Sequence, residues 1–372
     1  MNDNNKYLWM VIAGVLFVIG IEYLIARYKG LRVFRLQNTI ANLSMGIFDR
    51  VAGLLMVPLI YMHFNFLYTH FAIFNIPETK YYFILAVIVS DFLWYFYHRA
   101  GHQINLFWGA HIIHHQSEDY NYTVALNLTP FQVVIRILVW SLMPIIGFSA
   151  KVVLATHLVI GLYQFLLHTT LIPKLGIIEK FMVTPSHHRV HHGSNEEYLD
   201  KNYGGIFIIW DRLFGTFQVE KNPVSYGITK DINTRNFIPS VFHYYSNLWF
   251  QTKQLPNLKE KIKLLFKGPD WIPESGALKL SNTYIDKGSY DYKNYSKSKT
   301  FYLVFSMVFT FLILAITAYI MTDISRIYVY ALLSFIMLNL VIIGRLIENK
   351  SVLVLEIIKY IGLAFVFYKL YL

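Results

Sequence analysis

Histidine is the residue type whose number and spacing point most directly to chemistry in this chain. Fourteen histidines occur among 372 residues, and two windows, 98–115 and 187–192, hold nine of them in 24 residues, where chance would place about one. The imidazole side chain binds iron, zinc, copper and nickel. The clustering therefore predicts a metal site rather than nine unrelated histidines.

The spacing within the windows matches one face of a helix, because residues three and four positions apart lie side by side on a helical surface. Three sets follow this rule: box one is His98 and His102, box two is His111, His114 and His115, and box three is His188, His191 and His192. His168 stands alone between boxes two and three. A tetrahedral ion takes four ligands, so eight or nine imidazoles predict two metal ions with four or five ligands each.

A ligating imidazole usually donates its second ring N–H to a carboxylate or a carbonyl group. Asp91 lies seven residues before His98, two turns along the same helical face, and is a candidate for this role. Acidic residues also follow boxes two and three, and the candidates there are Glu118, Asp119, Glu196, Glu197, Asp200 and Asp211. His187 lies outside the helical spacing of box three and is a candidate ligand or hydrogen-bonding neighbour of the ligands. The isolated histidines His63, His70, His157 and His243 are interpreted as structural.

Two iron ions held by nitrogen ligands, with open coordination positions, could bind O2 and remove hydrogen from an unactivated C–H bond. Such a ligand set differs from that of the carboxylate-rich di-iron bundles. The chain has no cysteine, which excludes thiolate haem, iron–sulfur clusters and cysteine-ligated zinc. It also has no glycine-rich dinucleotide fingerprint, flavin signature or haem motif, so the electrons must come from an outside donor.

The composition indicates that these boxes lie in an integral membrane protein. Hydrophobic residues make up 55% of the chain and charged residues 15%, against about 25% charged in a soluble domain. We predict an all-α, polytopic helical membrane protein whose histidine-rich di-metal site faces the cytoplasm. The predicted membrane segments are 7–26, 51–74, 81–98, a hairpin of two tilted or partly inserted helices over 123–172, and then 301–321, 328–344 and 352–370.

Positive charge sets the predicted orientation. Arg27, Lys29, Arg32 and Arg35 follow the first segment and predict that this end is cytoplasmic. Segment 221–300 holds 13 Lys and Arg against 6 Asp and Glu, as expected for a layer that faces anionic headgroups. This distribution accounts for the net charge of +11 without nucleic acid binding, for which we find no basic soluble module. The predicted parts are an N-terminal transmembrane region at 1–79, a catalytic domain at 80–220, a basic interfacial segment at 221–300 and a C-terminal transmembrane region at 301–372.

Stretches outside the boxes carry a family resemblance, at 117–121, 164–169, 184–193, 200–204, 209–217, 226–229 and 266–271. Over about 80–275 the chain resembles the fatty acid hydroxylase/sterol desaturase superfamily, and within it the monooxygenases that cleave ether lipids with tetrahydrobiopterin. The resemblance implies nine metal ligands, which are His98, His102, His111, His114, His115, His168, His188, His191 and His192. It also implies two iron ions, O2, a membrane lipid substrate, and a pterin or a reductase as electron donor.

One position departs from the pattern that the resemblance implies, and the substrate stays open between alternatives. An acidic residue is expected after the second histidine of box one, where this chain has Gln103; a neutral amide there can change the tuning of iron or the handling of a pterin. Hydroxylases and desaturases share the boxes, so a sterol or fatty-acyl hydroxylase or desaturase is an alternative to hydroxylation of the ether-linked carbon of an alkylglycerol. A non-enzymatic alternative is a metal transporter or metal sensor, but transporters usually place ligands near the membrane midplane, whereas these boxes lie at segment ends and in a long segment outside the membrane.

Overall fold

Helices make up nearly all of the regular structure in the computed structural model, which describes residues 8–274 and 276–371. The α-helices are α1 (Leu8–Tyr28), α2 (Leu36–Phe71), α3 (Tyr82–Gln103), α4 (Asn105–His115), α5 (Phe131–Trp140), α6 (Leu142–Ile146), α7 (Ala150–Leu167), α8 (Pro185–His191), α9 (Ile209–Leu213), α10 (Phe237–Thr252), α11 (Leu258–Phe266), α12 (Lys297–Ile320), α13 (Arg326–Ile347) and α14 (Leu353–Tyr371). Short 3-10 helices, η2 (Val124–Leu126), η3 (Gly176–Lys180) and η4 (Glu196–Tyr198), lie in the connections. Strands β1 (Lys230–Ile232) and β2 (Tyr284–Asp286) pair in antiparallel fashion, with Lys230 opposite Asp286. The chain is therefore mostly helical, as predicted, with this small ribbon as an exception.

Within the described residues, five helices are long and apolar enough to cross a membrane: Trp9–Tyr28 in α1, α2, α7, α12 and α13. Large apolar side chains stay exposed on them, such as Phe17 at 69% and Phe301 at 72%, and exposed apolar surface of this extent is typical of a lipid-facing protein. The chain thus has the character of a multi-pass membrane protein. Residue 7, the predicted start of the first segment, lies outside the described residues.

The predicted segments and the observed helices differ in number. Helices α3 and α14 occupy the predicted segments 81–98 and 352–370, but neither is among these five helices, and both carry charged side chains, such as Asp91 in α3 and Lys359 in α14. The hairpin over 123–172 is present with unequal arms, because its first arm, Phe131–Ile146, is short and is broken between α5 and α6.

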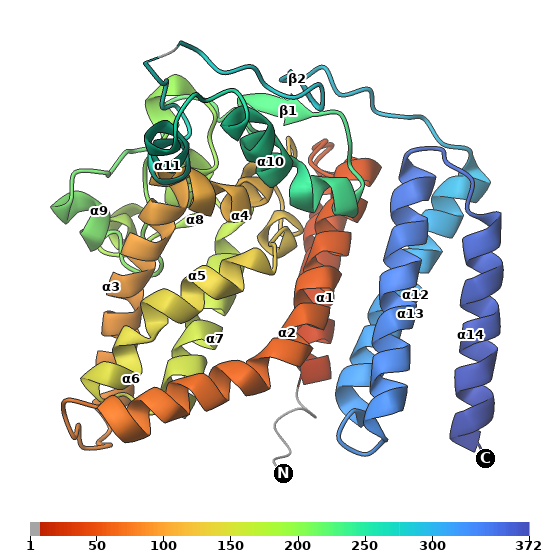
Figure 1. Ribbon diagram of the computed structural model, residues 1–372, viewed down its shortest axis with the longest axis horizontal. Coiled ribbons are helices and arrows are strands. Elements are labelled where there is room, and N and C mark those ends of the chain that lie inside the picture. The colour runs from red at the N-terminus through yellow and green to blue at the C-terminus, as the bar shows by residue number, and fades with distance from the viewer. Residues whose placement is uncertain (1–7, 275, 372) are drawn as a thin grey trace.

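Helix α2 is longer than the predicted segment 51–74, because it begins at Leu36. Its first turns bury polar side chains, including Asn38 and Asn42, so they lack the apolar pattern by which a membrane helix is recognised. The helix contains Pro58, and Figure 1 shows that its ribbon bends, as expected where a proline removes a backbone hydrogen bond.

The arrangement of the helices gathers the histidines at one end of the molecule. Figure 1 shows α12, α13 and α14 together on one side, and α12 contacts both α1 and α2. Helices α3, α5, α6 and α7 form the other side. Helices α10 and α11 and the β1–β2 ribbon lie across one end, where α4 and α8, the carriers of boxes two and three, also lie.

An apolar core between α3, α5, α6 and α7 holds the histidine-bearing helix α3 in place. Trp140 of α5 is fully buried in it and donates its indole N–H to Ser90 of α3 at 2.8 Å. Burial of one large apolar side chain contributes roughly 1.5–3 kcal/mol. The hydrogen bond in addition fixes which face of α3 is turned toward α5. The rotation of α3 about its axis is thereby set, which decides where His98 and His102 point.

Candidate metal centre

Nine histidines, those of the boxes and His168, come together in two buried clusters. The five-histidine cluster comprises His98, His102, His111, His115 and His191, and the four-histidine cluster comprises His114, His168, His188 and His192. Within each cluster the candidate ligand nitrogens all lie within 4.8 Å of one another. Each of the nine side chains is 8% exposed or less. The two clusters are consistent with a site for two metal ions.

Boxes two and three are each divided between the two clusters. On α4, His114 joins the four-histidine cluster, while the other two histidines of box two join the five-histidine cluster. At α8, His191 joins the five-histidine cluster, while the other two histidines of box three join the four-histidine cluster. Because residues three and four positions apart differ in angle around a helix, one face can supply ligands to two neighbouring ions.

Ring nitrogens approach each other across both clusters. The Nε2–Nε2 distances are 3.1 Å between His98 and His111, 3.2 Å between His111 and His115, 3.2 Å between His114 and His168, and 3.0 Å between His168 and His188. Metal–nitrogen bonds of about 2.0–2.1 Å place adjacent ligands of one ion roughly 3 Å apart. The observed distances match this separation.

Three ligand candidates direct their other ring nitrogen to a backbone carbonyl oxygen. The distances are 2.9 Å from His98 Nδ1 to Tyr203 O, 2.8 Å from His168 Nδ1 to Gln164 O and 2.9 Å from His191 Nδ1 to Lys201 O. An Nδ1–H group that donates to a carbonyl leaves the Nε2 lone pair for a metal. Carbonyls were expected as one kind of partner, but the particular carbonyls could not be predicted, since every residue carries one.

Other ring nitrogens in the clusters are buried without a hydrogen-bond partner. They are His102 Nε2, His114 Nδ1, His188 Nδ1, His191 Nε2 and His192 Nε2. Leaving a buried polar atom unpaired costs about 1–3 kcal/mol, and folded proteins seldom do so without a compensating ligand, water or ion. The residues present therefore fit a nitrogen cage for metal ions.

Burial keeps the imidazoles uncharged. Desolvation lowers the pKa of His168 to about 4. It also lowers the pKa values of His111, His115, His188 and His192 well below 6.5, and the neighbouring imidazoles add to this effect. Only a neutral imidazole has a nitrogen lone pair for a metal, so these side chains are ready to bind at neutral pH.

The loop 200–207 supplies two of the three carbonyls and has an unusual backbone. Asp200 and Asn202 have positive φ angles of 59° and 56°, in a region that Asp and Asn tolerate better than most residues. A Cβ at Gly205 would lie 2.3 Å from Asp91 Oδ1. Glycine at this position therefore lets the loop approach α3 closely.

Asp91 anchors this loop rather than a histidine ring. Its carboxylate accepts hydrogen bonds from the backbone N–H groups of Ile206 and Phe207, at 2.6 and 3.1 Å, and from the indole N–H of Trp210 at 2.8 Å. The side chain is fully buried. Asp91 thus acts on His98 indirectly, through the position of the loop.

Asp211 holds the same loop from its other side. Its carboxylate accepts hydrogen bonds from the backbone N–H groups of Tyr203 and Gly204, at 2.7 and 2.8 Å, and from the hydroxyl of Thr216 at 2.7 Å. The carbonyl that faces His98 belongs to Tyr203. Asp211 therefore orients that carbonyl.

The remaining acidic candidates differ in their contacts. Asp200 lies beside a ring, with its Oδ1 3.6 Å from His102 Nδ1. Glu118 and Asp119 instead contact the guanidinium of Arg35, at 2.9 and 3.6 Å. These two residues tie the loop after box two to the start of α2.

Four further candidates lie away from the clusters. Gln103 accepts a hydrogen bond from Arg99 Nε at 3.0 Å. The ring of His187 packs against Phe217, with centroids 5.6 Å apart, and belongs to neither cluster. Glu196 and Glu197 are exposed in η4.

Residues without a predicted metal-binding role form a wall beside the four-histidine cluster. The buried ring of Tyr120 lies 5.8 Å from the ring of His168 and stacks on Tyr226 at 4.6 Å. Arg189, inside box three, donates two hydrogen bonds to Glu220, at 2.9 and 2.7 Å. The one available signal was the position of Arg189 between two histidine pairs.

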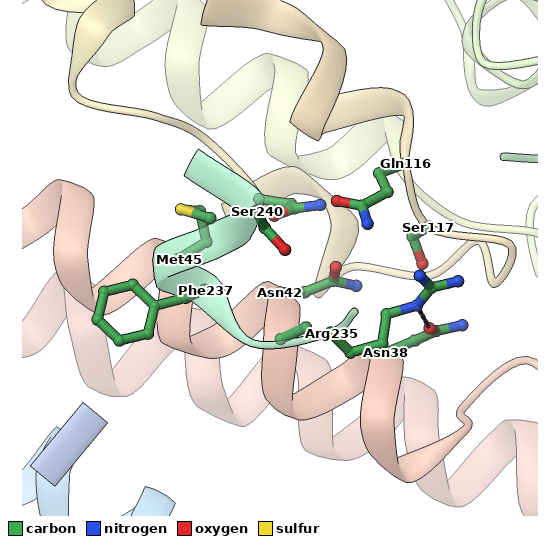
Figure 2. Close-up of a pocket in the computed structure, with 10 residues that line it drawn as sticks. Asn38, Asn42, Met45, Gln116, Ser117, Arg235, Phe237 and Ser240 are labelled. Atoms are coloured by element: carbon green, nitrogen blue, oxygen red, sulfur yellow. Dashed lines mark hydrogen bonds between the residues drawn. The ribbon is translucent and has the colours of Figure 1, made fainter. Parts of the chain in front are cut away.

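A small polar cavity lies behind box two (Figure 2). Its lining residues are Asn38, Ala41, Asn42, Met45, Gln116, Ser117, Asn127, Arg235, Phe237 and Ser240. The side-chain nitrogen of Gln116 and the hydroxyl of Ser117 are buried there without a partner, while Arg235 donates to Asn38 at 3.0 Å. The cavity measures about 10 Å³, which is room for about one water molecule. It is too small for a lipid or a pterin.

Comparisons with known proteins agree with the chemistry of these clusters. The profile of the Fatty acid hydroxylase family matches residues 83–216. The chain is 34% identical over 327 residues to alkylglycerol monooxygenase of Homo sapiens, covering 87% of this chain and 73% of that protein. It is 36% identical over 241 residues to alkylglycerol monooxygenase of Danio rerio, covering 64% of this chain and 54% of that protein.

More distant similarity reaches a sterol enzyme. The chain is 27% identical over 144 residues to lathosterol oxidase of Homo sapiens, covering 38% of this chain and 46% of that protein. No solved structure matches the chain.

Proposed function

The chain belongs to the fatty acid hydroxylase family, and from that premise we propose that it is a membrane-bound di-iron monooxygenase that hydroxylates a lipid C–H bond with O2. The nine histidines of the two clusters would hold the two iron ions. The observation that carries this proposal is the pair of buried clusters that, among the described residues, consist of histidine alone. Bound iron would supply the activation of O2.

The substrate we propose is an alkylglycerol, hydroxylated at the carbon next to its ether oxygen. The similarity to alkylglycerol monooxygenases over 87% of this chain supports it. One oxygen atom of O2 enters the C–H bond to give a hemiacetal, which breaks into a fatty aldehyde and a free glycerol hydroxyl. The other oxygen atom leaves as water, after accepting two electrons and two protons. Tetrahydrobiopterin is the electron donor that we propose.

The role of the polypeptide in this reaction is to hold ligands and exclude water. Backbone carbonyls of Gln164, Lys201 and Tyr203 orient the imidazoles. The aromatic wall of Tyr120 and Tyr226 keeps one side of the four-histidine cluster dry. A dry site protects a reactive oxidant from side reactions.

The catalytic part is proposed to span 80–220 and to face the cytoplasm. The family match over 83–216 supports the boundaries. Arg27 in the last turn of α1 and Lys29, Arg32 and Arg35 after it support the orientation, because positive residues beside a membrane segment favour the cytoplasmic side.

An oxygen-uptake assay tests the proposal. The full chain, purified in an uncharged detergent and loaded with iron, is given a 1-O-alkylglycerol with and without tetrahydrobiopterin. We expect pterin-dependent O2 consumption matched by release of fatty aldehyde, and about two irons per chain by metal analysis. The matched control substrate is the 1-acylglycerol of the same chain length, which has no ether-linked carbon and should release no aldehyde.

Three other outcomes would contradict parts of the proposal. Turnover of a sterol or an acyl chain with a cytochrome or ferredoxin donor would replace the substrate and the donor. Full activity with one metal ion per chain would remove the di-iron assignment. Uptake of iron into vesicles without oxygen consumption would favour a transporter.

A further inference from the structure

A crevice rich in arginine opens where α1 ends and the chain turns toward α2. Its lining residues are Tyr23, Ala26, Arg27, Leu31, Arg32, Phe34 and Arg35, which we call the arginine crevice. Its volume is about 270 Å³, just below the range of roughly 300–1,000 Å³ for small-molecule sites. Helix α1 is long and apolar enough to cross a membrane, and a span by α1 would put the crevice at the level of lipid headgroups.

The charge of the arginine crevice is positive and only partly compensated. Three of its seven lining residues are arginines, and none is acidic. Arg35 is paired with Glu118 and Asp119. In the part of the chain that the structure describes, no carboxylate lies within ion-pair distance of Arg27 or Arg32. Two guanidinium groups beside one hollow are well suited to an anion with several oxygens, such as a phosphate.

The rest of the lining is apolar and leads toward the interior. The rings of Tyr23 and Phe34 meet edge to face, with centroids 5.5 Å apart. Phe34 also packs against the apolar cluster that contains Tyr122 and Phe165. The ligand that suits both halves has an anionic head and an apolar chain.

The arginine crevice and the metal centre share the loop that follows box two. The backbone N–H of Arg35 donates to Asp119 at 2.8 Å, and Asp119 comes four residues after His115. On the apolar side, Phe165 comes three residues before His168. A lipid headgroup in the crevice is therefore held on the same side of the membrane as the two histidine clusters.

We propose that the arginine crevice binds the phosphate group of a membrane lipid through Arg27 and Arg32, with the adjoining part of the lipid against Tyr23 and Phe34. The binding site stands on the crevice alone. Its consequence for catalysis, a preference for phosphate-bearing ether lipids over uncharged alkylglycerols, rests on the proposed function.

Ligand binding by the full, iron-loaded chain in uncharged detergent tests the proposal without turnover. The probe is a fluorescent 1-O-alkylglycerol 3-phosphate, and its matched ligand is the same lipid without the phosphate. We expect the variant Arg27→Gln/Arg32→Gln to bind the phosphate lipid about tenfold or more weakly, and to bind the uncharged lipid within about twofold of the native chain. Both arginines are exposed, so the substitutions leave the fold intact.

The control variant is Lys29→Gln, which removes a positive charge from the same turn but does not line the crevice. It should bind both lipids as the native chain does. Equal weakening in the control would overturn the site and favour general attraction to the charged surface. Unchanged binding in the double variant would overturn the site as well. Inorganic phosphate should displace the probe poorly. Displacement as strong as that by the unlabelled phosphate lipid at equal concentration would overturn the lipid as ligand and assign a free anion.

The same variants separate this site from the proposed function. One outcome is that the chain does not cleave ether lipids, while only the double variant binds the phosphate lipid more weakly. In that case the crevice is confirmed as a binding site and the proposed function is wrong. If ether cleavage is found and the double variant treats both lipids as the native chain does, the proposed function stands and the crevice assignment fails.

Discussion

The histidine centre and the three C-terminal helices both bury polar side chains between helices, but they leave them in opposite states. In the C-terminal helices, Lys359 is 4% exposed and reaches Glu356 at 2.5 Å, Asn339 at 3.2 Å and Tyr302 at 3.3 Å. Its ammonium group therefore has one ion-pair partner and donates two hydrogen bonds, although Glu356 Oε2 itself accepts no hydrogen bond. In the histidine centre, five ring nitrogens are buried without a partner.

The difference distinguishes the Lys359 group, whose role is structural, from the histidine centre, whose role is to bind a ligand. Opposite charges and hydrogen bonds satisfy the C-terminal group from within the chain, as expected for polar residues that join helices in a membrane. Imidazoles cannot offer one another an opposite charge, and after burial the neighbouring rings lower the pKa of His111 and His188 further. A bound metal ion would give unpaired ring nitrogens of the histidine centre a partner.

Removal of one ligand should have the largest effect. His115→Ala opens the five-histidine cluster and His192→Ala opens the four-histidine cluster. We expect either variant to lose about one iron per chain and at least about a thousandfold in activity, since a catalytic metal supplies several kcal/mol of stabilisation. Metal analysis and the aldehyde assay measure these quantities.

His70→Ala is the matched control, because His70 is exposed at the end of α2 and belongs to neither cluster. Its iron content and activity should equal those of the native chain. Native activity in both ligand variants would contradict the assignment of the histidine clusters as a metal centre.

Breaking the C-terminal polar group should come next in size and should act on stability. Lys359→Met leaves the partly buried Glu356 without its cation. Removal of one partner of a fully buried ion pair costs about 3–5 kcal/mol, so we expect a loss of about 3 kcal/mol or less. The midpoint of chemical unfolding measures the loss. Iron content should not change, because these residues lie outside both clusters.

The double variant Lys359→Met/Glu356→Gln should recover most of that stability, because no unpaired charge remains. A double variant as unstable as the single one would show that the group is not satisfied from within the chain.

A change in the loop 200–207, which orients His98 without binding metal, should have an intermediate effect on iron binding. Asp91→Asn replaces an acceptor of three N–H groups by an amide, which leaves at least one donor unsatisfied and shifts the loop that faces His98. We expect iron affinity to fall about 10–100-fold, the usual cost of losing a group that orients a ligand. Competition with a chelator measures the affinity.

Gln103→Ala, at the C-terminal end of the same helix, should leave iron affinity unchanged, because the Gln103 side chain accepts its hydrogen bond from Arg99. If Gln103→Ala lowers iron affinity as much as Asp91→Asn, the role assigned to the loop is wrong.

The smallest effect concerns Arg189 and Glu220, which pair within the chain although they border the metal centre. Burial alone would raise the pKa of Glu220, but the hydrogen bonds and charge of Arg189 outweigh it and hold the pKa below 4.5. The stabilisation is therefore complete above pH 4.5 and is lost as pH falls through the lowered pKa. We expect Glu220→Gln to lower the free energy of unfolding at neutral pH by about 1 kcal/mol or less. The variant should therefore unfold at a lower temperature than the native chain.

Thermal unfolding against pH measures this difference, which should shrink as the solution becomes more acidic than pH 4.5. A difference that stays constant down to strongly acidic pH would show that the charge of Glu220 contributes nothing.

The features that could be predicted from the sequence are those with local causes. The helical spacing of the boxes identified His111, His114 and His115 as one face, and the structure puts them on one helix, α4. The missed features are non-local. Helix α2 begins at Leu36, and its buried Asn38 is satisfied by Asp119, a residue distant in sequence.

The amino-acid sequence by itself determined the helical and membrane character of the chain and the number and spacing of its imidazoles, because hydrophobicity and the 3.6-residue helical period are properties of neighbouring residues. The tertiary structure alone decided which imidazoles share a cluster, so that His114 and His115 separate although they are adjacent. It also decided that the carbonyl of Tyr203 faces His98 while Glu118 turns to Arg35. Every residue offers a carbonyl and every carboxylate can accept a hydrogen bond, so the path of the chain in space selects the partner.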